Sequence, residues 1–249
     1  MVKKLTSRLL NTAVRLGSLG AKLFLVLYIT KGFTLDDVGS YGLVTAIVAI
    51  AIPLIGFRID YCALRDIVGL SPFQTALMLR DQLVFYLLNY LIFLFCFYFV
   101  ARHLNNEKEA TYLMYAAILS VLESLASLTS GNLVSTGRPV IANCLFFIRS
   151  ASWVPFVILF GVISLSFHNL SSIFNFWLGG VTLSLMLNVI IWAKMPWKSV
   201  FLMPINWLWV RRSLKIALPL GIVTGKQGDR KSTRLNSSHL KLSRMPSSA

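Results

Sequence analysis

Acidic residues are scarce in this chain, which holds 9 Asp and Glu against 24 Lys and Arg. Charged residues make up only 13% of the sequence and hydrophobic residues 56%, whereas soluble domains average about 25% and about 45 to 50%. A soluble domain needs more charged side chains to cover its surface. The composition therefore excludes an ordinary soluble protein and predicts a membrane protein.

Cysteines and catalytic motifs are also sparse. Cys62, Cys96 and Cys144 lie in or beside separate apolar runs, with neither a Cys-x-x-Cys spacing nor a histidine cluster nearby, so we expect no disulfide framework and no metal site. The sequence contains no Walker loop, no Gly-x-Ser-x-Gly and no His-Glu-x-x-His. His103 and His168 fall in links between apolar runs, where we expect them to be solvated. These absences predict a protein that is not an enzyme, binds no cofactor and has no nucleic-acid partner.

Long apolar runs separated by short polar links dominate the chain. Such runs predict an all-α, polytopic bundle of six transmembrane helices followed by the start of a seventh. The start of the chain, MVKKLTSRLL, has the positive charge of a signal peptide, but no small-residue cleavage site follows, so we expect the first run to be retained. The runs span Leu9–Ile29, Val38–Phe57, Gln82–Ala101, Tyr112–Val134, Val140–Ile163 and Ser172–Ala193, and the seventh opens at Leu214.

The last 21 residues differ in character from the rest. Residues 229–239, DRKSTRLNSSH, resemble the translation of a sequencing-library adapter, and residues 243–249, SRMPSSA, resemble the same adapter after a variable barcode. The alternative is a disordered basic tail at an anionic membrane surface. We expect residues 1–228 to form an N-terminal transmembrane lobe that is truncated in the seventh span, and residues 229–249 to be a non-native tail outside the fold.

Basic residues collect on alternate links. With the N-terminus in the cytoplasm, the cytoplasmic segments hold twelve Lys and Arg and the outer links hold three. The positive-inside rule then predicts a multi-pass protein with a cytoplasmic N-terminus. The twelve are Lys3, Lys4, Arg8, Arg58, Arg65, Arg80, Arg138, Lys194, Lys198, Arg211, Arg212 and Lys215, and the three are Lys31, Arg102 and Lys108.

Four ionisable residues fall inside the predicted spans: Arg15, Lys22, Glu123 and Arg149. A charged side chain at the bilayer centre costs about 2.5–3.5 kcal/mol, so such groups usually face a bundle interior or a wet cavity. Three cations and one acid would suit an anionic ligand. The first run also places its polar residues on one side of a helix, because they recur at steps of three and four. These residues are Arg8, Asn11, Arg15, Ser18 and Lys22.

The residues alone leave several alternatives open. Glu123 and Arg149 sit near the middle of consecutive antiparallel spans, where they form either a buried ion pair or a ligand or proton site. Arg15 is close enough to the end of its span to reach the headgroups. Lys22 has no such exit and is our first candidate for a cation that lines a cavity. Asp36 and Asp37 form either a sugar-transfer site of a membrane glycosyltransferase or a simple N-cap.

Three stretches of the chain resemble the O-antigen flippases, the polysaccharide exporter branch of the multidrug/oligosaccharidyl-lipid/polysaccharide superfamily. The stretches are LDDVGSYGLV, GFRIDYCALRDI with Asp60 and Arg65, and LES…TGRPVIAN…IRSASW with Glu123, Arg138, Pro139, Arg149 and Trp153. The resemblance covers residues 1–228, where six spans, a basic link and a restarted span are similar to the first lobe of such a transporter.

The resemblance implies a second lobe of six or more spans and a central cationic cavity. It also implies transport of an undecaprenyl-pyrophosphate-linked oligosaccharide across the bacterial inner membrane by alternating access. In that picture Arg15, Lys22 and Arg149 bind the substrate and Glu123 carries a coupling proton. The implied partners are this lipid-linked substrate, membrane lipids and the polysaccharide polymerase machinery. Alternatives are an exporter of drugs or other lipids from the same superfamily, a membrane glycosyltransferase and a structural membrane scaffold.

Overall fold

The computed structural model describes residues 2–164 and 167–218, with side chains from residue 12 onward. The side chains of Arg8 and Asn11 and the adapter-like residues 229–249 lie outside this part. Every regular element that the structure describes is a helix. The helices are α1 (Val2–Gly32), α2 (Leu35–Ile55), α3 (Ile59–Asp66), α4 (Pro72–Arg102), α5 (Glu107–Ser135), α6 (Pro139–Ser150), α7 (Val154–Ile163), α8 (Leu170–Trp192) and α9 (Trp197–Phe201). Residues 207–218 are helical as well.

Six helical stretches in the described part are long and apolar enough to cross a membrane. Each overlaps one of the six predicted runs, so the prediction of an all-α, multi-pass membrane bundle is confirmed. The stretches are Thr12–Gly32, Leu35–Ile55, Pro72–Arg102, Glu107–Ser135, Pro139–Ile163 and Leu170–Trp192.

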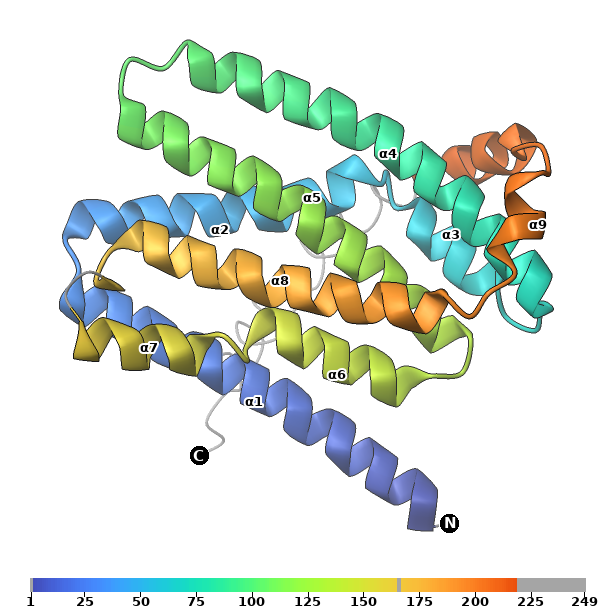
Figure 1. Cartoon of the computed structure of the whole chain (residues 1–249), viewed down its shortest axis with the longest axis horizontal. Helices are drawn as coiled ribbons and strands as arrows, with labels where there is room; N and C mark the ends of the chain where they lie inside the picture. The colour runs from blue at the N-terminus through green and yellow to red at the C-terminus, as the bar shows by residue number, and fades with distance from the viewer. Residues whose placement is uncertain (1, 165–166, 219–249) are drawn as a thin grey trace, which may run out of the picture.

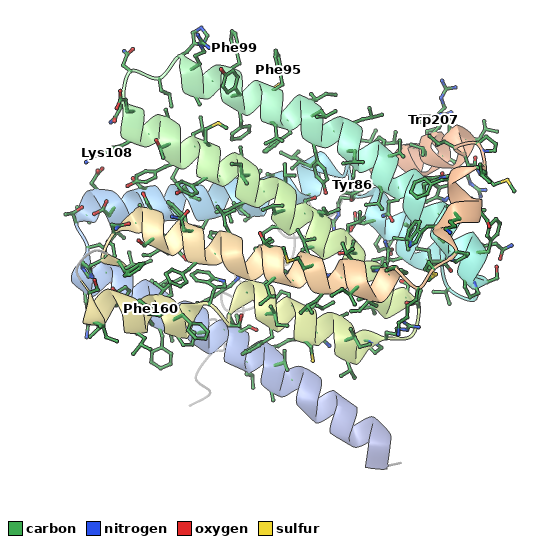
Figure 2. The ribbon with its side chains drawn as sticks, in the orientation of Figure 1. Tyr86, Phe95, Phe99, Lys108, Phe160 and Trp207 are labelled. Carbon is green, nitrogen blue, oxygen red and sulfur yellow. The ribbon has the colours of Figure 1, made fainter. Side chains whose placement is uncertain are left out.

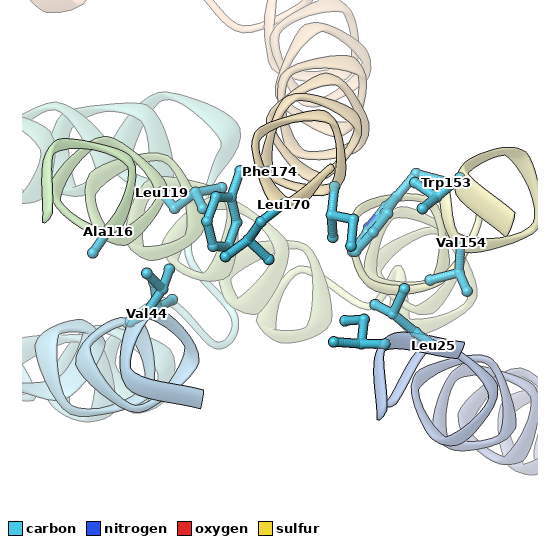
Figure 3. Close-up of a cluster of buried hydrophobic side chains, with 12 residues drawn as sticks. Leu25, Val44, Ala116, Leu119, Trp153, Val154, Leu170 and Phe174 are labelled. Atoms are coloured by element: carbon cyan, nitrogen blue, oxygen red, sulfur yellow. The ribbon is translucent and has the colours of Figure 1, made fainter. Parts of the chain in front are cut away.

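The six stretches lie roughly along one axis, and their links alternate between the two ends of the bundle (Figure 1). α5 is central and packs against α2, α4, α6 and α8. The largest cluster of buried hydrophobic residues lies where α1, α2, α5 and α8 meet the start of α7 (Figure 3). Leu25, Val44, Leu119, Val154 and Phe174 represent the five helices in this cluster. The core thus joins the first two spans to the last three.

Side-chain caps fix where several helices begin. Thr34 caps α2, Asn106 caps α5 and Asn169 caps α8, each by accepting a hydrogen bond from a backbone N–H of the first turn. Ser71 and Gln74 form a complete capping box at the start of α4. α4 therefore begins ten residues before the predicted run. Residues 58–81, which lie between the second and third predicted runs, are largely α3 and the first turns of α4.

Aromatic side chains of α4 point away from the bundle, as Figure 2 shows for Phe95 and Phe99. These two side chains are 70% and 58% exposed in the isolated chain. An apolar outer face suits contact with lipid, because lipid tails offer no hydrogen-bond partners to polar side chains. The outer face of α4 therefore carries aromatic side chains of the third run.

The fifth span is not one helix but two. α6 ends at Ser150 and α7 begins at Val154, because Pro155 has no N–H to donate and its ring blocks a continuous helix. The Ser152 hydroxyl donates to the Ile148 carbonyl at 2.6 Å, and the Trp153 indole donates to the Arg149 carbonyl at 3.0 Å. These side chains satisfy carbonyls that the break leaves free. The break places Arg149 at the end of a half-helix in the middle of the span.

Candidate functional site

A cavity of about 430 Å³ lies between α1, α5 and α6. α6 packs against both neighbours and forms the floor, while α1 and α5 form the walls. Arg15, Ser18, Leu19 and Lys22 line it from α1, Ser127, Ser130, Gly131 and Val134 from α5, and Ala142, Asn143, Phe146 and Arg149 from α6. We call this the cationic cavity, because three of its lining residues carry positive charge.

A second cavity of about 430 Å³ lies against the first. Lys22, Phe146 and Arg149 line both cavities, so these residues form the boundary between them. The second cavity adds Glu123 and the Trp153 and Trp177 side chains, whose stacked rings lie 6.0 Å apart. We call it the aromatic cavity. The cationic cavity and the aromatic cavity therefore meet at Lys22 and Arg149.

The three candidate cations differ in how they are held. Arg15 and Lys22 are exposed on α1, and neither makes a side-chain hydrogen bond or ion pair within the described part of the chain. Ser18 lies between them but is buried, and its hydroxyl donates to the Val14 carbonyl of its own helix at 2.9 Å. The two cations of α1 are thus free to bind an anion, whereas the serine between them is not.

Arg149 is buried and paired with Glu123, which is also buried. Its Nη1 lies 3.5 Å from Glu123 Oε2 and donates to the Glu123 carbonyl at 3.2 Å. The other carboxylate oxygen accepts a hydrogen bond from Trp177 Nε1 at 2.9 Å, and the guanidinium carbon lies 5.3 Å from the centre of the Phe146 ring. The ion pair that the sequence left open is therefore formed, with Arg149 on the wall shared by both cavities and Glu123 on the side of the aromatic cavity.

Three buried polar atoms of the lining have no hydrogen-bond partner within the described residues: Arg149 Nε, Ser130 Oγ and Ser150 Oγ. Ser130 lines the cationic cavity and Ser150 the aromatic cavity, while Arg149 lines both. Buried polar atoms in native proteins are usually partnered by protein or water. The walls therefore hold three buried polar groups that the described residues leave unsatisfied.

The four residues predicted from the sequence as site candidates all line one of the two adjoining cavities. Arg15, Lys22 and Arg149 share the cationic cavity, and Glu123 lies beyond them in the aromatic cavity. Sequence reasoning did not find Trp177, the partner of Glu123. No local signal could have found it, because 54 residues separate the two in the chain.

Asp36 and Asp37, the candidates for a sugar-transfer site, lie outside both cavities. The Asp37 amide donates to Thr34 Oγ1 at 3.3 Å, and the Thr34 hydroxyl donates to Asp37 Oδ2 at 2.8 Å. This is the geometry of a helix N-cap. Among the residues that the structure describes, no group of three or more His, Cys, Asp and Glu could hold a metal ion.

The structure corrects the expectation that His168 is merely solvated. Its Nδ1 lies 3.0 Å from Tyr28 Oη and its Nε2 lies 2.8 Å from the Gly32 carbonyl, while its ring stacks on Phe33 at 4.5 Å. His168 therefore ties the segment between α7 and α8 to the end of α1. His103 is exposed, and its Nδ1 lies 2.8 Å from the Phe99 carbonyl.

Arg80 is a second buried arginine with a structural role. The sequence predicted it only as one of the basic residues of the cytoplasmic segments. Arg80 donates from Nε and Nη2 to Asp81 Oδ1, at 3.0 and 2.6 Å. It also donates to the carbonyls of Val200, of Met203 at 2.6 Å and of Pro204 at 2.9 Å. The adjacent Arg-Asp pair at the start of an apolar run was the only signal in the sequence.

No family model matches the chain, and neither a curated protein nor a solved structure is significantly similar to it. A function for this chain therefore rests on its own residues and their arrangement.

Proposed function

We propose that this chain is one lobe of a transporter that moves a lipid-linked oligosaccharide, joined to its lipid through pyrophosphate, across a membrane by alternating access. The observation that carries the proposal is that Arg15, Lys22 and Arg149 line one cavity within membrane-spanning helices. Guanidinium and ammonium groups are the usual protein partners of phosphate oxygens. Because isolated charges are costly within a bilayer, three cations gathered there favour an anionic substrate.

Each residue has a distinct role in this proposal. Arg15 and Lys22 have free head groups and would bind the pyrophosphate first. Arg149 would then contact both the substrate and Glu123. Glu123, the acid paired with Arg149, would carry the coupling proton.

The broken fifth span gives this site a means to move. Half-helices that meet near the bilayer midplane surround the substrate sites of many transporters. Here the break at residues 151–153 adjoins Arg149 and lines the aromatic cavity through Trp153. In the proposal, the lobe rocks against a second lobe, and α6 and α7 change their mutual angle.

The location is part of the same proposal. The segments that hold twelve of the Lys and Arg residues lie toward one end of the bundle, and the positive-inside rule would put that end in the cytoplasm. We place the protein in the bacterial inner membrane, where polysaccharide polymerases would receive its product.

One observation favours a second candidate, an exporter of drugs or other lipids. The aromatic cavity combines Glu123 with Tyr41, Trp153 and Trp177, a set that suits an organic cation. Lys22 and Arg149 line the same space and repel such a ligand, so the pyrophosphate substrate is preferred.

Binding of undecaprenyl pyrophosphate to the purified chain in lipid nanodiscs tests the proposal. Replacing Lys22 by Gln should weaken binding about tenfold or more, because a hydrogen bond to a charged group contributes about 1.5–3 kcal/mol. Lys31→Gln is the matched control, since Lys31 also belongs to α1 but lies outside both cavities. Equal loss in both variants, or tighter binding of an organic cation than of the pyrophosphate, would contradict the proposal.

The two-lobe architecture has its own test. Residues 1–228 alone should fail to restore growth or surface polysaccharide in a flippase-deficient strain, because a single lobe leaves its cations without the partner they would face. Complementation by residues 1–228 would overturn this part of the proposal.

A further inference from the structure

The segment that follows the sixth span has an unusual composition. Residues 194–218 contain five Lys and Arg, no Asp or Glu, and three of the six tryptophans of the protein. We call this stretch the basic segment. It comprises α9, the turn after it and the helical residues 207–218.

The five basic side chains of this segment are all exposed. None of them forms an ion pair in the part of the chain that the structure describes. Their charges are therefore not neutralised by the protein. The five are Lys194, Lys198, Arg211, Arg212 and Lys215.

Large apolar side chains are exposed beside these charges. Leu202 is 87% exposed, Leu208 79%, Phe201 69% and Trp207 47%. Exposed apolar groups next to unpaired cations are costly in water alone, but they suit the boundary of a bilayer, where tails and headgroups meet.

The position of the segment along the membrane normal follows from α4. This helix has 31 residues and is about 46 Å long at 1.5 Å per residue, whereas the hydrocarbon core is about 30 Å thick. Its apolar run covers residues 82–101, so residues 72–81 extend beyond the core. Arg80 binds three carbonyls of the basic segment, and Asp81 accepts from the Asn206 amide at 3.2 Å. The segment is thereby held at the level of the headgroups.

We propose that the basic segment binds the phosphate groups of anionic phospholipids at one membrane surface, while its exposed Trp, Phe and Leu side chains insert between the lipids. Each Lys or Arg near an anionic surface favours binding about fivefold. The surface lies at the end of the bundle opposite Lys108, as Figure 2 shows for Trp207. This inference does not depend on what the cavities bind.

Quenching of tryptophan fluorescence by brominated lipids tests the proposal on the whole chain, reconstituted in phosphatidylcholine vesicles. We expect dibrominated phosphatidylglycerol at one tenth of the lipid to quench at least about threefold more than dibrominated phosphatidylcholine at the same fraction. The triple variant Lys198→Gln, Arg211→Gln, Arg212→Gln should lose this preference. Lys31→Gln, Arg102→Gln, Lys108→Gln is the matched control at the other end of the bundle and should keep it.

Two further measurements on the unaltered protein keep the test independent of variant folding. Raising the salt concentration to 0.5 M should reduce the preference toward one, because charge attraction is screened. Inorganic phosphate at the concentration of the anionic lipid should leave the preference unchanged. No preference for phosphatidylglycerol, equal loss in both triple variants, or displacement by inorganic phosphate would each overturn the proposal.

Discussion

Two buried arginine–acid pairs in this protein are held in opposite ways. Arg80 donates to Asp81 and to three backbone carbonyls, so its guanidinium is fully used by the fold. Arg149 lies 3.5 Å from Glu123 and leaves its Nε without a partner among the described residues. We call Arg80–Asp81 the satisfied pair, because its hydrogen bonds hold two segments of the fold together. We call Arg149–Glu123 the loose pair, because it lies beside a cavity and keeps a hydrogen-bond donor that a ligand could use.

The largest expected effect comes from breaking the satisfied pair. Arg80→Met should lower the free energy of unfolding by about 3–5 kcal/mol, because it leaves the Asp81 charge buried and unpaired. Thermal unfolding in detergent measures this loss. Arg65→Met is the control, because the Arg65–Asp66 pair has an arginine that is 68% exposed and contributes about 0–1 kcal/mol. A double variant Arg80→Met, Asp81→Leu should recover much of the stability, and failure to recover would show that the carbonyl contacts matter more than the charge.

The loose pair lies beside the helix break, where Trp153 packs closely against Gly180 of α8. A Cβ at Gly180 would lie 2.5 Å from Trp153 Cδ1, so Gly180→Ala should cost about 1–3 kcal/mol of stability through overpacking. The neighbouring Gly179→Ala is the control, since nothing lies within 4 Å of its added Cβ. Equal melting temperatures for the two variants would contradict close packing at the break.

Removing the acid from the loose pair should change the affinity for the substrate rather than the stability of the fold. Glu123→Gln deletes a negative charge a few Å from the cationic cavity and should tighten binding of undecaprenyl pyrophosphate about tenfold. Asp81→Asn, the same change in the satisfied pair, should leave that affinity unaltered. Isothermal titration of both variants decides the point, and a matching change in affinity for both would remove the distinction between the pairs.

The smallest effects should come from two buried serines. The Ser184 hydroxyl donates to the Leu145 carbonyl of another helix at 3.1 Å, whereas the Ser130 hydroxyl has no partner within the described residues. Ser184→Ala should therefore cost about 1 kcal/mol of stability and Ser130→Ala close to none. Ser130→Ala should instead weaken pyrophosphate binding severalfold. A larger loss of stability in the Ser130 variant would show that its hydroxyl serves the fold.

Much of the architecture could be read from local patterns. The apolar runs gave the six spans, and the spacing of Arg15, Ser18 and Lys22 predicted that they share one side of α1. The early start of α4 was readable too, since Ser71, Pro72 and Gln74 form a capping signature. Pro155 carried the signal for the break in the fifth span, although the run around it is apolar enough to pass as one helix.

The rest depends on contacts between residues that are distant in the chain. The carbonyls that Arg80 binds lie 120 to 124 residues later, and Trp177 reaches Glu123 across 54 residues. Composition and spacing cannot specify such pairs, because they arise only when helices have packed. The sequence therefore identified the charged residues within the spans, but not which of them the fold satisfies.

In the proposal, Arg15, Lys22 and Arg149 make an anion-attracting cavity, open to water, inside the membrane-spanning helices. Its most direct test is the rate at which thiol reagents of opposite charge label a cysteine placed at Asn143 on the cavity floor, in a background with Cys62, Cys96 and Cys144 replaced by Ala. We expect the anionic reagent to react severalfold faster than the cationic one, and Lys22→Gln to reduce this ratio. No labelling at all, or faster reaction with the cationic reagent, would contradict it.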